Sequence, residues 1–168
     1  MTQTFRLAAP EDFSDVTDLF KKAIVHMNEQ GIHQWDELYP TAQDLRADID
    51  CRQMHLLIIG EQLASAVVLN EFQQSEYLDG QWRETEGRPA VVHRLCVHPD
   101  FQGQGIATKT MELSHALLAK DGYSSVRLDA FSLNPSALKL YARLGYRNAG
   151  TVLLRKGLFH LFEKQLSQ

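Results

Sequence analysis

The sequence predicts a mixed α/β fold, and three patterns lead to this prediction. Near the amino terminus, apolar residues recur every three or four positions, which is the period of an amphipathic helix. After residue 54 the pattern changes to short apolar, β-prone runs separated by turn residues. In residues 90–144 strand-like and helix-like segments alternate, an order typical of α/β domains.

A short strand and a long helix are predicted to come first. Phe5–Leu7 alternates in polarity and is suited to open a sheet. Pro10 lies near the start of the helix, where acidic residues favour the positive end of the helix dipole. The apolar positions of this helix continue to Met27, and Gly31 ends it.

The remaining elements follow from the same two periods. In chain order we expect a short helix at 44–51, a β-hairpin formed by 55–59 and 63–69, a loop or extended strand ends at 73–88, strands at 90–97 and 125–131, helices at 105–120 and 135–144, and two strand-like runs within 151–164. No repeat or linker interrupts this order, so residues 4–168 are interpreted as a single domain.

Composition excludes several classes of function. Seventeen Lys and Arg against 21 Asp and Glu give a net charge of -4, which argues against broad binding to nucleic acid or membrane surfaces. Cys51 and Cys96 are too few for a disulfide framework, so a reducing cytoplasm is the simplest setting. No signal peptide is visible, and the apolar runs are far shorter than the roughly 20 residues that span a bilayer. We expect a soluble, cytoplasmic protein.

A glycine-rich turn follows the strand that ends at Leu95-Cys96-Val97. The turn reads Gln102-Gly103-Gln104-Gly105-Ile106-Ala107 and opens a helix. Unpaired backbone N–H groups at a helix start, together with the helix dipole, attract anions. Glycine lets the backbone approach phosphate oxygens and takes dihedral angles that other residues resist. The turn therefore predicts a phosphate-binding site.

Two familiar phosphate loops do not fit this turn. A Walker loop and a dinucleotide fingerprint both fail at Thr108, although Lys109 and Thr110 follow it. A degenerate Walker loop that binds a nucleotide is therefore an improbable alternative.

A third pattern, Gln/Arg-x-x-Gly-x-Gly/Ala, fits without a mismatch at Gln102, Gly105 and Ala107. At this turn the chain resembles the GNAT family of N-acetyltransferases, whose acetyl-CoA loop has that pattern after its fourth strand. A second stretch, Asn134 to Tyr146, looks like the helix and turn of the same family, with Asn134, Tyr141 and Gly145-Tyr146 at the expected places. The resemblance extends from about Phe5 to the carboxyl terminus.

This resemblance implies a fold and a cofactor. The expected fold has three layers, with a mainly antiparallel sheet split at its centre and helices on both faces. Acetyl-CoA is the expected acyl donor, and no metal site is expected because the histidines lack partners at metal-ligand spacing. The expected cofactor-binding residues are Leu95, Cys96, Val97, Gln102, Gly103, Gln104, Gly105, Ile106, Ala107, Thr108, Asn134 and Tyr141.

Catalytic and acceptor residues follow in part from the resemblance and in part from chemistry. The family implies that Tyr141 protonates the departing thiolate, and that backbone N–H groups near Leu95–Val97 stabilise the oxyanion. An amine must lose a proton before it attacks, and His93 and Glu71 are the candidate bases. Four aromatic residues in irregular segments are candidates for the acceptor pocket: Trp35, Tyr39, Tyr77 and Trp82. Each of these side chains has a structural alternative, as a core or surface residue.

The predicted reaction is direct transfer of an acetyl group from acetyl-CoA to a primary amine within a ternary complex. The net charge of -4 slightly favours a small cationic amine over a protein amine. A homodimer is a further expectation from the family. The alternative function is a non-catalytic module that binds acyl-CoA and acts as a sensor or regulator.

Overall fold

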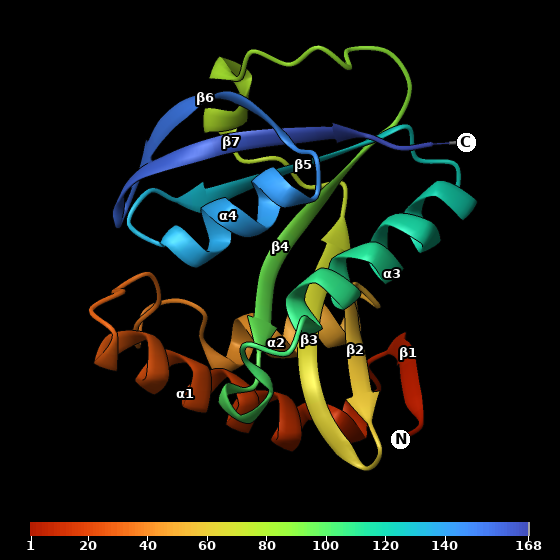
Figure 1. Ribbon diagram of the computed structural model, residues 1–168, viewed down its shortest axis with the longest axis vertical. Helices are drawn as coiled ribbons and strands as arrows, with labels where there is room; N and C mark the ends of the chain where they lie inside the picture. Colours follow the sequence, from red (N-terminus) through yellow and green to blue (C-terminus); the bar gives the residue numbers. More distant parts are fainter. Residues whose placement is uncertain (168) are drawn as a thin grey trace. The chain divides into compact units, whose positions relative to one another are not determined.

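The computed structural model describes residues 1–167, and its strands and helices follow one another in the order that the sequence predicts (Figure 1). Within that range the strands are β1 (Gln3–Leu7), β2 (Met54–Ile59), β3 (Gln62–Asn70), β4 (Pro89–Val97), β5 (Ser125–Phe131), β6 (Arg147–Leu154) and β7 (Gly157–Gln165). The α-helices are α1 (Phe13–Glu29), α2 (Ala42–Asp50), α3 (Ile106–Lys120) and α4 (Pro135–Arg143). Short 3-10 helices are η1 (Pro10–Asp12), η2 (Ser75–Asp79) and η3 (Pro99–Phe101).

The strands are hydrogen-bonded in the order β1-β2-β3-β4-β5-β7-β6. The pairs β1–β2, β2–β3, β5–β7 and β6–β7 are antiparallel, whereas β4 and β5 run parallel. The prediction of a mixed, mainly antiparallel sheet in an α/β fold is confirmed. In the parallel pair, residues 89–91 of β4 are hydrogen-bonded to residues 125–127 of β5. Strand β5 therefore extends past the last residue that pairs with β4.

The chain divides into two compact units. The first contains residues 1–69 and 94–111, and the second contains residues 70–93 and those from Glu112 onward. Strand β4 and helix α3 each contribute residues to both units. The prediction of a single functional domain over residues 4–168 is not decided by this division.

In the first unit, alternate residues of β2 and β3 face helices α1 and α2. Met54 and Leu56 of β2 and Ala66 of β3 belong to one buried apolar cluster with residues of both helices. Phe20 of α1 packs on Trp35 with ring centroids 5.4 Å apart. Burial of this one face of an amphipathic helix is the main stabilisation that α1 receives.

The opposite face of β3 meets the start of α3. Ser65 lies between Ala64 and Ala66 on the strand, so its side chain points away from α1 and α2. Its hydroxyl is buried and lies 2.6 Å from the hydroxyl of Thr110 on α3. Helices therefore cover both faces of the sheet in this unit, as expected.

The second unit also has two covered faces. Phe162 of β7 packs on Tyr141 of α4, with ring centroids 5.9 Å apart. Asp129 of β5 is paired with Leu161, the neighbour of Phe162, and so projects from the other face. On that face the hydroxyl of Tyr77, in η2, donates a hydrogen bond to Asp129.

Several boundaries differ from the sequence-based expectation for identifiable reasons. Helix α2 begins at Ala42, before the expected residue 44, because Thr41 and Asp44 form a reciprocal capping box. The segment 73–88, expected as a loop, contains the single 3-10 turn of η2. The two carboxyl-terminal runs are longer than expected and pair as an antiparallel hairpin. Within residues 1–167, no helix combines the length and the apolar character needed to cross a bilayer.

Candidate active site

The glycine-rich turn adopts the conformation that its glycines suggest. Gly103 and Gly105 have φ values of +74° and +76°, in the left-handed region that other residues resist. A Cβ atom added at either position would meet no protein atom within 4 Å. Glycine is therefore required by the backbone conformation and not by crowding, and the side of the turn where those Cβ atoms would lie is open.

The backbone N–H groups of this turn are available for an anion. Residues 102–105 are exposed, and α3 starts at Ile106. Across the part of the chain that the structure describes, no acceptor is bonded to the N–H groups of residues 103–108; the first pairing is Lys109 to the Gly105 carbonyl. Such groups at a helix start carry the positive end of the dipole.

Two side chains hold the turn in place through hydrogen bonds to the backbone that precedes it. The amide of Gln102 donates to the Val97 carbonyl at 3.4 Å, and the amide of Gln104 donates to the Asp100 carbonyl at 2.9 Å. Both bonds tie the turn to the strand and short helix that precede it. The turn is thus held by its own chain, so its N–H groups are preorganised before any ligand binds.

Strand β4 contains a local distortion just before the predicted cofactor-binding residues. Arg94 has a φ of +49°, which is unusual for any residue other than glycine. Its guanidinium forms two hydrogen bonds with Asp48 of α2, at 2.6 and 2.8 Å, and a third with the Tyr39 hydroxyl. These contacts hold Arg94 in a strained conformation that the strand alone would not favour.

The Asp48–Arg94 pair is largely removed from solvent. The exposed fractions of the two side chains are 7% and 14%. Burial raises the pKa of Asp48, while the paired, always-charged guanidinium favours the carboxylate. This pair was missed by sequence reasoning, because an Asp in a short helix and an Arg in a strand carry no signal that they meet.

Cys96 is buried in the core, as its place on β4 suggested. Its side chain is 3% exposed, and burial raises the pKa of the thiol. A thiol held in its neutral form is a poor nucleophile, which agrees with a packing role for the side chain. Any contact of Cys96 with acetyl-CoA is expected through its backbone.

Tyr141 lies on α4 with its ring buried among other aromatic side chains. The ring packs between Tyr146 and Phe162, with centroids 5.5 and 5.9 Å away. No group among residues 1–167 hydrogen-bonds its hydroxyl. Burial first, and the charge of Asp129 second, raise the pKa of Tyr141. The hydroxyl therefore keeps its proton at neutral pH, as a general acid must.

Tyr146, which holds one side of the Tyr141 ring, is itself held by α3. Its hydroxyl lies 2.6 Å from Nε2 of His115. Burial lowers the pKa of His115 to about 4, so the imidazole is neutral at pH 7. The sequence did not predict this contact, because His115 and Tyr146 are 31 positions apart.

Asn134 caps helix α4, as its position before Pro135 predicted. Its side-chain oxygen accepts a hydrogen bond from the N–H of Ala137 at 3.2 Å. This cap gives Asn134 a role in stabilising the start of α4. A contact with the pantetheine arm stays a prediction.

The two candidate bases have different surroundings. Nε2 of His93 lies 2.8 Å from the Asn70 side-chain oxygen and 3.1 Å from the Phe72 carbonyl, so it carries a proton and donates. Glu71 pairs with Arg88 at 2.8 Å and accepts from the Tyr123 hydroxyl. These hydrogen bonds lower the pKa of Glu71. A carboxylate stabilised in this way has little tendency to take a proton.

The four candidate acceptor residues are placed differently. Trp35 is 7% exposed and lies in the core with Phe20, while Tyr39 binds Arg94. Tyr77 is 2% exposed, and its carbonyl accepts from the Trp82 indole at 2.8 Å. These contacts give all four a structural role, and their contact with an acceptor stays a prediction.

The structure groups the predicted site residues by unit. Trp35, Tyr39 and residues 95–108 belong to the first unit. Glu71, Tyr77, Trp82, His93, Asn134 and Tyr141 belong to the second.

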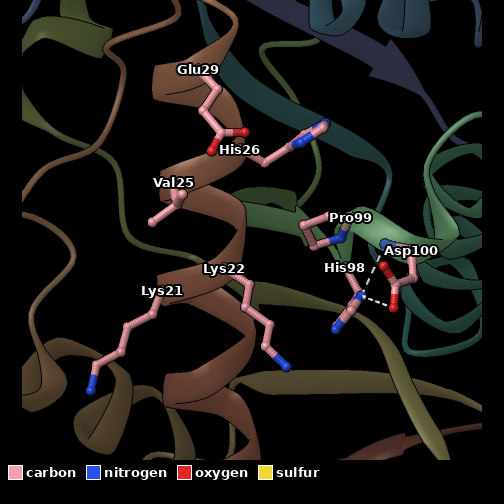
Figure 2. A pocket seen from close by; sticks show the side chains of 8 residues that line it. All are labelled: Lys21, Lys22, Val25, His26, Glu29, His98, Pro99 and Asp100. Carbon is pink, nitrogen blue, oxygen red and sulfur yellow. Dashed lines mark hydrogen bonds and ion pairs between the residues drawn. The ribbon is translucent and has the colours of Figure 1, made fainter.

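A shallow groove of about 420 Å³ lies in the first unit, between α1 and η3. Figure 2 shows its lining: Lys21, Lys22, Val25, His26 and Glu29 from α1, and His98, Pro99 and Asp100 from the segment before the turn. Charges of both signs line it, and the ammonium of Lys22 is paired with Asp18 at 2.9 Å. None of the site residues predicted from the sequence lines this groove.

Comparison with known proteins agrees with the geometry of the turn. Residues 24–162 match the acetyltransferase (GNAT) domain family. The fold is similar to that of a GNAT-family acetyltransferase from Streptococcus agalactiae, with 23% identity, coverage of 99% of this chain and 96% of that chain, and a TM-score of 0.87. A GNAT-family acetyltransferase from Listeria monocytogenes has 22% identity, coverage of 98% and 95%, and a TM-score of 0.78.

A third similar structure, YncA from Salmonella typhimurium, was solved with its cofactor acetyl-CoA. It has 16% identity, coverage of 100% of this chain and 96% of that chain, and a TM-score of 0.73. At these identities the solved structures show the fold alone, whereas the family match spans most of the chain. The protein therefore belongs to the GNAT acetyltransferase family and is an acyl-CoA-dependent transferase.

Proposed function

We propose that this protein transfers the acetyl group of acetyl-CoA to a primary amine, by direct attack within a ternary complex. The observation that carries the proposal is the turn at the start of α3, where the N–H groups of residues 103–108 have no acceptor in the part of the chain described. A pyrophosphate would satisfy these groups without a basic side chain.

In this proposal the turn positions the donor. Gln102 to Thr108 bind the pyrophosphate, and the backbone of Leu95–Val97 pairs with the pantetheine arm. A backbone N–H in that segment stabilises the oxyanion that forms on the thioester carbonyl. Holding both substrates together supplies proximity and needs no covalent intermediate on the enzyme.

Tyr141 acts as the general acid in this proposal. Its pKa is raised by burial, so the hydroxyl is neutral at rest and has a proton to give when the thiolate forms. Its hydroxyl has no hydrogen-bond partner within residues 1–167, which leaves it able to reach a ligand atom. Asn134 contacts the pantetheine arm in this arrangement, in addition to capping α4.

The acceptor is proposed to be a small amine that carries positive charge. The chain has a net charge of -4, and Glu76 and Asp129 lie in the same unit as Tyr141. A non-catalytic acyl-CoA sensor is the second candidate. It would bind acetyl-CoA in the same turn but release no thiol with any amine.

Calorimetric titration tests donor binding, and a turnover assay then separates the enzyme from the sensor. We expect acetyl-CoA to bind with a Kd of roughly micromolar order, and ATP with magnesium to give no heat beyond dilution. A panel of amines then follows, read out as release of free thiol: a polyamine, free amino acids, an aminoglycoside and a peptide with a free amino terminus. Absence of acetyl-CoA binding would contradict the proposal, and binding without turnover would favour the sensor.

A further inference from the structure

Strand β5 carries a carboxylate just beyond the point where β4 leaves it. The last residue of β5 that pairs with β4 is Arg127, opposite Val91. Asp129 follows two positions later on the same face of the strand, and on its other side it is paired with Leu161 of β7. In this second unit Asp129 therefore lies where the sheet begins to split.

One oxygen of this carboxylate is fixed and the other is not. The Tyr77 hydroxyl donates to Oδ2 of Asp129 at 2.7 Å. Tyr77 is itself held by Trp82, whose ring packs on it at 5.7 Å and whose indole N–H donates to its carbonyl. Within residues 1–167, Oδ1 of Asp129 has no hydrogen-bond partner. The carboxylate is thus oriented through one oxygen, while the other can accept a donor.

The charges around Asp129 favour a cation. Burial, opposed by the Tyr77 hydrogen bond and helped by the charge of Glu76, raises the pKa of Asp129. Arg127, the nearest basic residue on the strand, directs its guanidinium to Gln73 and to the Glu84 carbonyl instead. No guanidinium or ammonium within residues 1–167 is bonded to Asp129.

The groups that face Asp129 come from each neighbouring element. They are Tyr77 and Glu76 from η2, Arg127 from β5 itself and Leu161 from β7. The charge of Asp129 raises the pKa of Tyr141, so the two groups interact electrostatically although their side chains start from opposite faces of the sheet. A carboxylate serving only to anchor Tyr77 would be a costly choice, because a neutral amide accepts the same bond.

We propose that Asp129 is a catalytic residue that binds the ammonium of the acceptor and takes its proton. This inference rests on the proposed function and extends it, because it selects a cationic amine and supplies the base. It adds a residue that neither the sequence motifs nor the candidate bases His93 and Glu71 identified.

The proton transfers balance in this scheme. The ammonium gives one proton to Oδ1 of Asp129 and becomes a neutral amine. The amine nitrogen attacks the thioester carbonyl, and the carbon–sulfur bond breaks with the electron pair on sulfur. Tyr141 gives its proton to the thiolate and regains one from the amide nitrogen that has formed. Asp129 then releases its proton to solvent.

The test compares two substitutions at one hydrogen bond. Asp129→Asn keeps an oxygen that accepts from Tyr77 but removes the charge and the base. Tyr77→Phe removes the hydrogen bond but keeps the carboxylate. Both variants are first titrated with acetyl-CoA, and each is expected to bind it as the wild type does, which shows that the fold and the donor site persist.

The readout uses the amine of highest turnover in the panel, together with its analogue that carries a trifluoromethyl group on the carbon bearing the amino group, which is largely neutral at pH 7. Asp129→Asn is expected to lower kcat/KM about 100-fold for the protonated amine and only a few-fold for the neutral analogue. Tyr77→Phe is expected to move the acidic limb of the pH profile upward by about one pH unit, with the plateau retained.

The failures of the two proposals are distinguishable. If the wild type releases no thiol with any amine, the proposed function and this inference are both overturned. If the wild type is active and Asp129→Asn retains its activity, this inference alone is overturned. An equal loss for the protonated and the neutral amine would also overturn it, since a structural defect does not depend on the protonation state of the substrate.

Discussion

The turn before α3 and the aromatic cluster around Tyr141 are built by opposite means. In the turn, main-chain N–H groups form the proposed donor site and residues 102–105 are exposed. Around Tyr141, side chains form the proposed catalytic site and they are buried: Tyr146 is 7% exposed and Phe162 is 7% exposed. The first arrangement would bind an anion through a backbone geometry that glycine permits. The second keeps a hydroxyl protonated by removing it from water.

Under the proposed function, donor binding and chemistry depend on different physical quantities. Donor affinity would depend on backbone conformation, which a change in side-chain charge alters little. Turnover would depend on pKa values, which burial and neighbouring charges alter strongly. Substitutions in the two regions should therefore affect different constants.

The largest effect is expected from removal of the Tyr141 hydroxyl. Tyr141→Phe keeps the ring between Tyr146 and Phe162 but removes the proton donor, so kcat is expected to fall about 100-fold. The Kd for acetyl-CoA, measured by calorimetry, should change little. Tyr123→Phe makes the same chemical change in an exposed hydrogen bond to Glu71 and serves as the control. Equal losses of kcat and affinity in Tyr141→Phe would refute the role of general acid.

A smaller effect, on the Kd for acetyl-CoA, is expected from a substitution in the turn. Gly105→Ala places a Cβ on a residue with φ of +76°, at a strain of about 1–2 kcal/mol. Relief of that strain distorts the turn, and we expect acetyl-CoA to bind about 10-fold more weakly with kcat nearly unchanged.

Gly31 provides a matched control for this substitution. Its φ is +77° and no atom lies within 4 Å of an added Cβ, as at Gly105, but it ends α1. Gly31→Ala should therefore lose the same stability in urea unfolding without any loss of affinity. The same loss of affinity in both variants would mean that the turn is not the donor site.

The pH dependence of the free energy of unfolding tests the burial of His115 against the aromatic cluster. The folded-state pKa of His115 is about 4, below its unfolded value of 6.5, so its contribution to stability is present above pH 6.5. That contribution is lost as pH falls from 6.5 towards 4, because the unfolded chain takes up the proton first. Since the ring is partly exposed, we expect a loss of about 1 kcal/mol at pH 5, measured by urea unfolding.

His115→Gln removes the titrating group and should unfold with less pH dependence over this range. An unchanged slope in that variant would show that another group is responsible. The catalytic optimum should not follow His115, because the imidazole is already neutral at pH 7.

The smallest effect is expected at Glu71. Glu71→Gln disrupts an exposed ion pair with Arg88, and such pairs contribute about 0–1 kcal/mol. Turnover is expected to change less than about twofold. A loss as large as that of Tyr141→Phe would instead identify Glu71 as the base and contradict the assignment of Asp129.

Local signals in the sequence predicted the parts of the site that depend on local structure. The Gly103–Gly105 turn, the Asn134 cap and the buried Cys96 each follow from a few adjacent residues, and the structure shows these conformations. The α/β fold and the element order were predicted for the same reason, because hydrophobic periodicity is a local property.

Contacts between distant residues could not be predicted in this way. Asp48 and Arg94 are 46 positions apart, and Tyr77 and Asp129 are 52 apart. Each pair requires the sheet order to bring its members together, and nothing near Asp129 in the sequence indicates that its partner is a tyrosine hydroxyl. Trp35 shows the converse problem, because an aromatic residue in an irregular segment can belong to the core.

The main-chain construction of the turn also bears on how the protein can change over evolutionary time. Since its N–H groups belong to the main chain, exposed positions whose side chains do not hold the turn, such as Lys109, can change without loss of the proposed donor site. The residues proposed to select the acceptor lie elsewhere in the chain. A descendant can thus acquire a new acceptor while it inherits the same acyl donor, and a library that varies the acceptor residues can start from an intact turn.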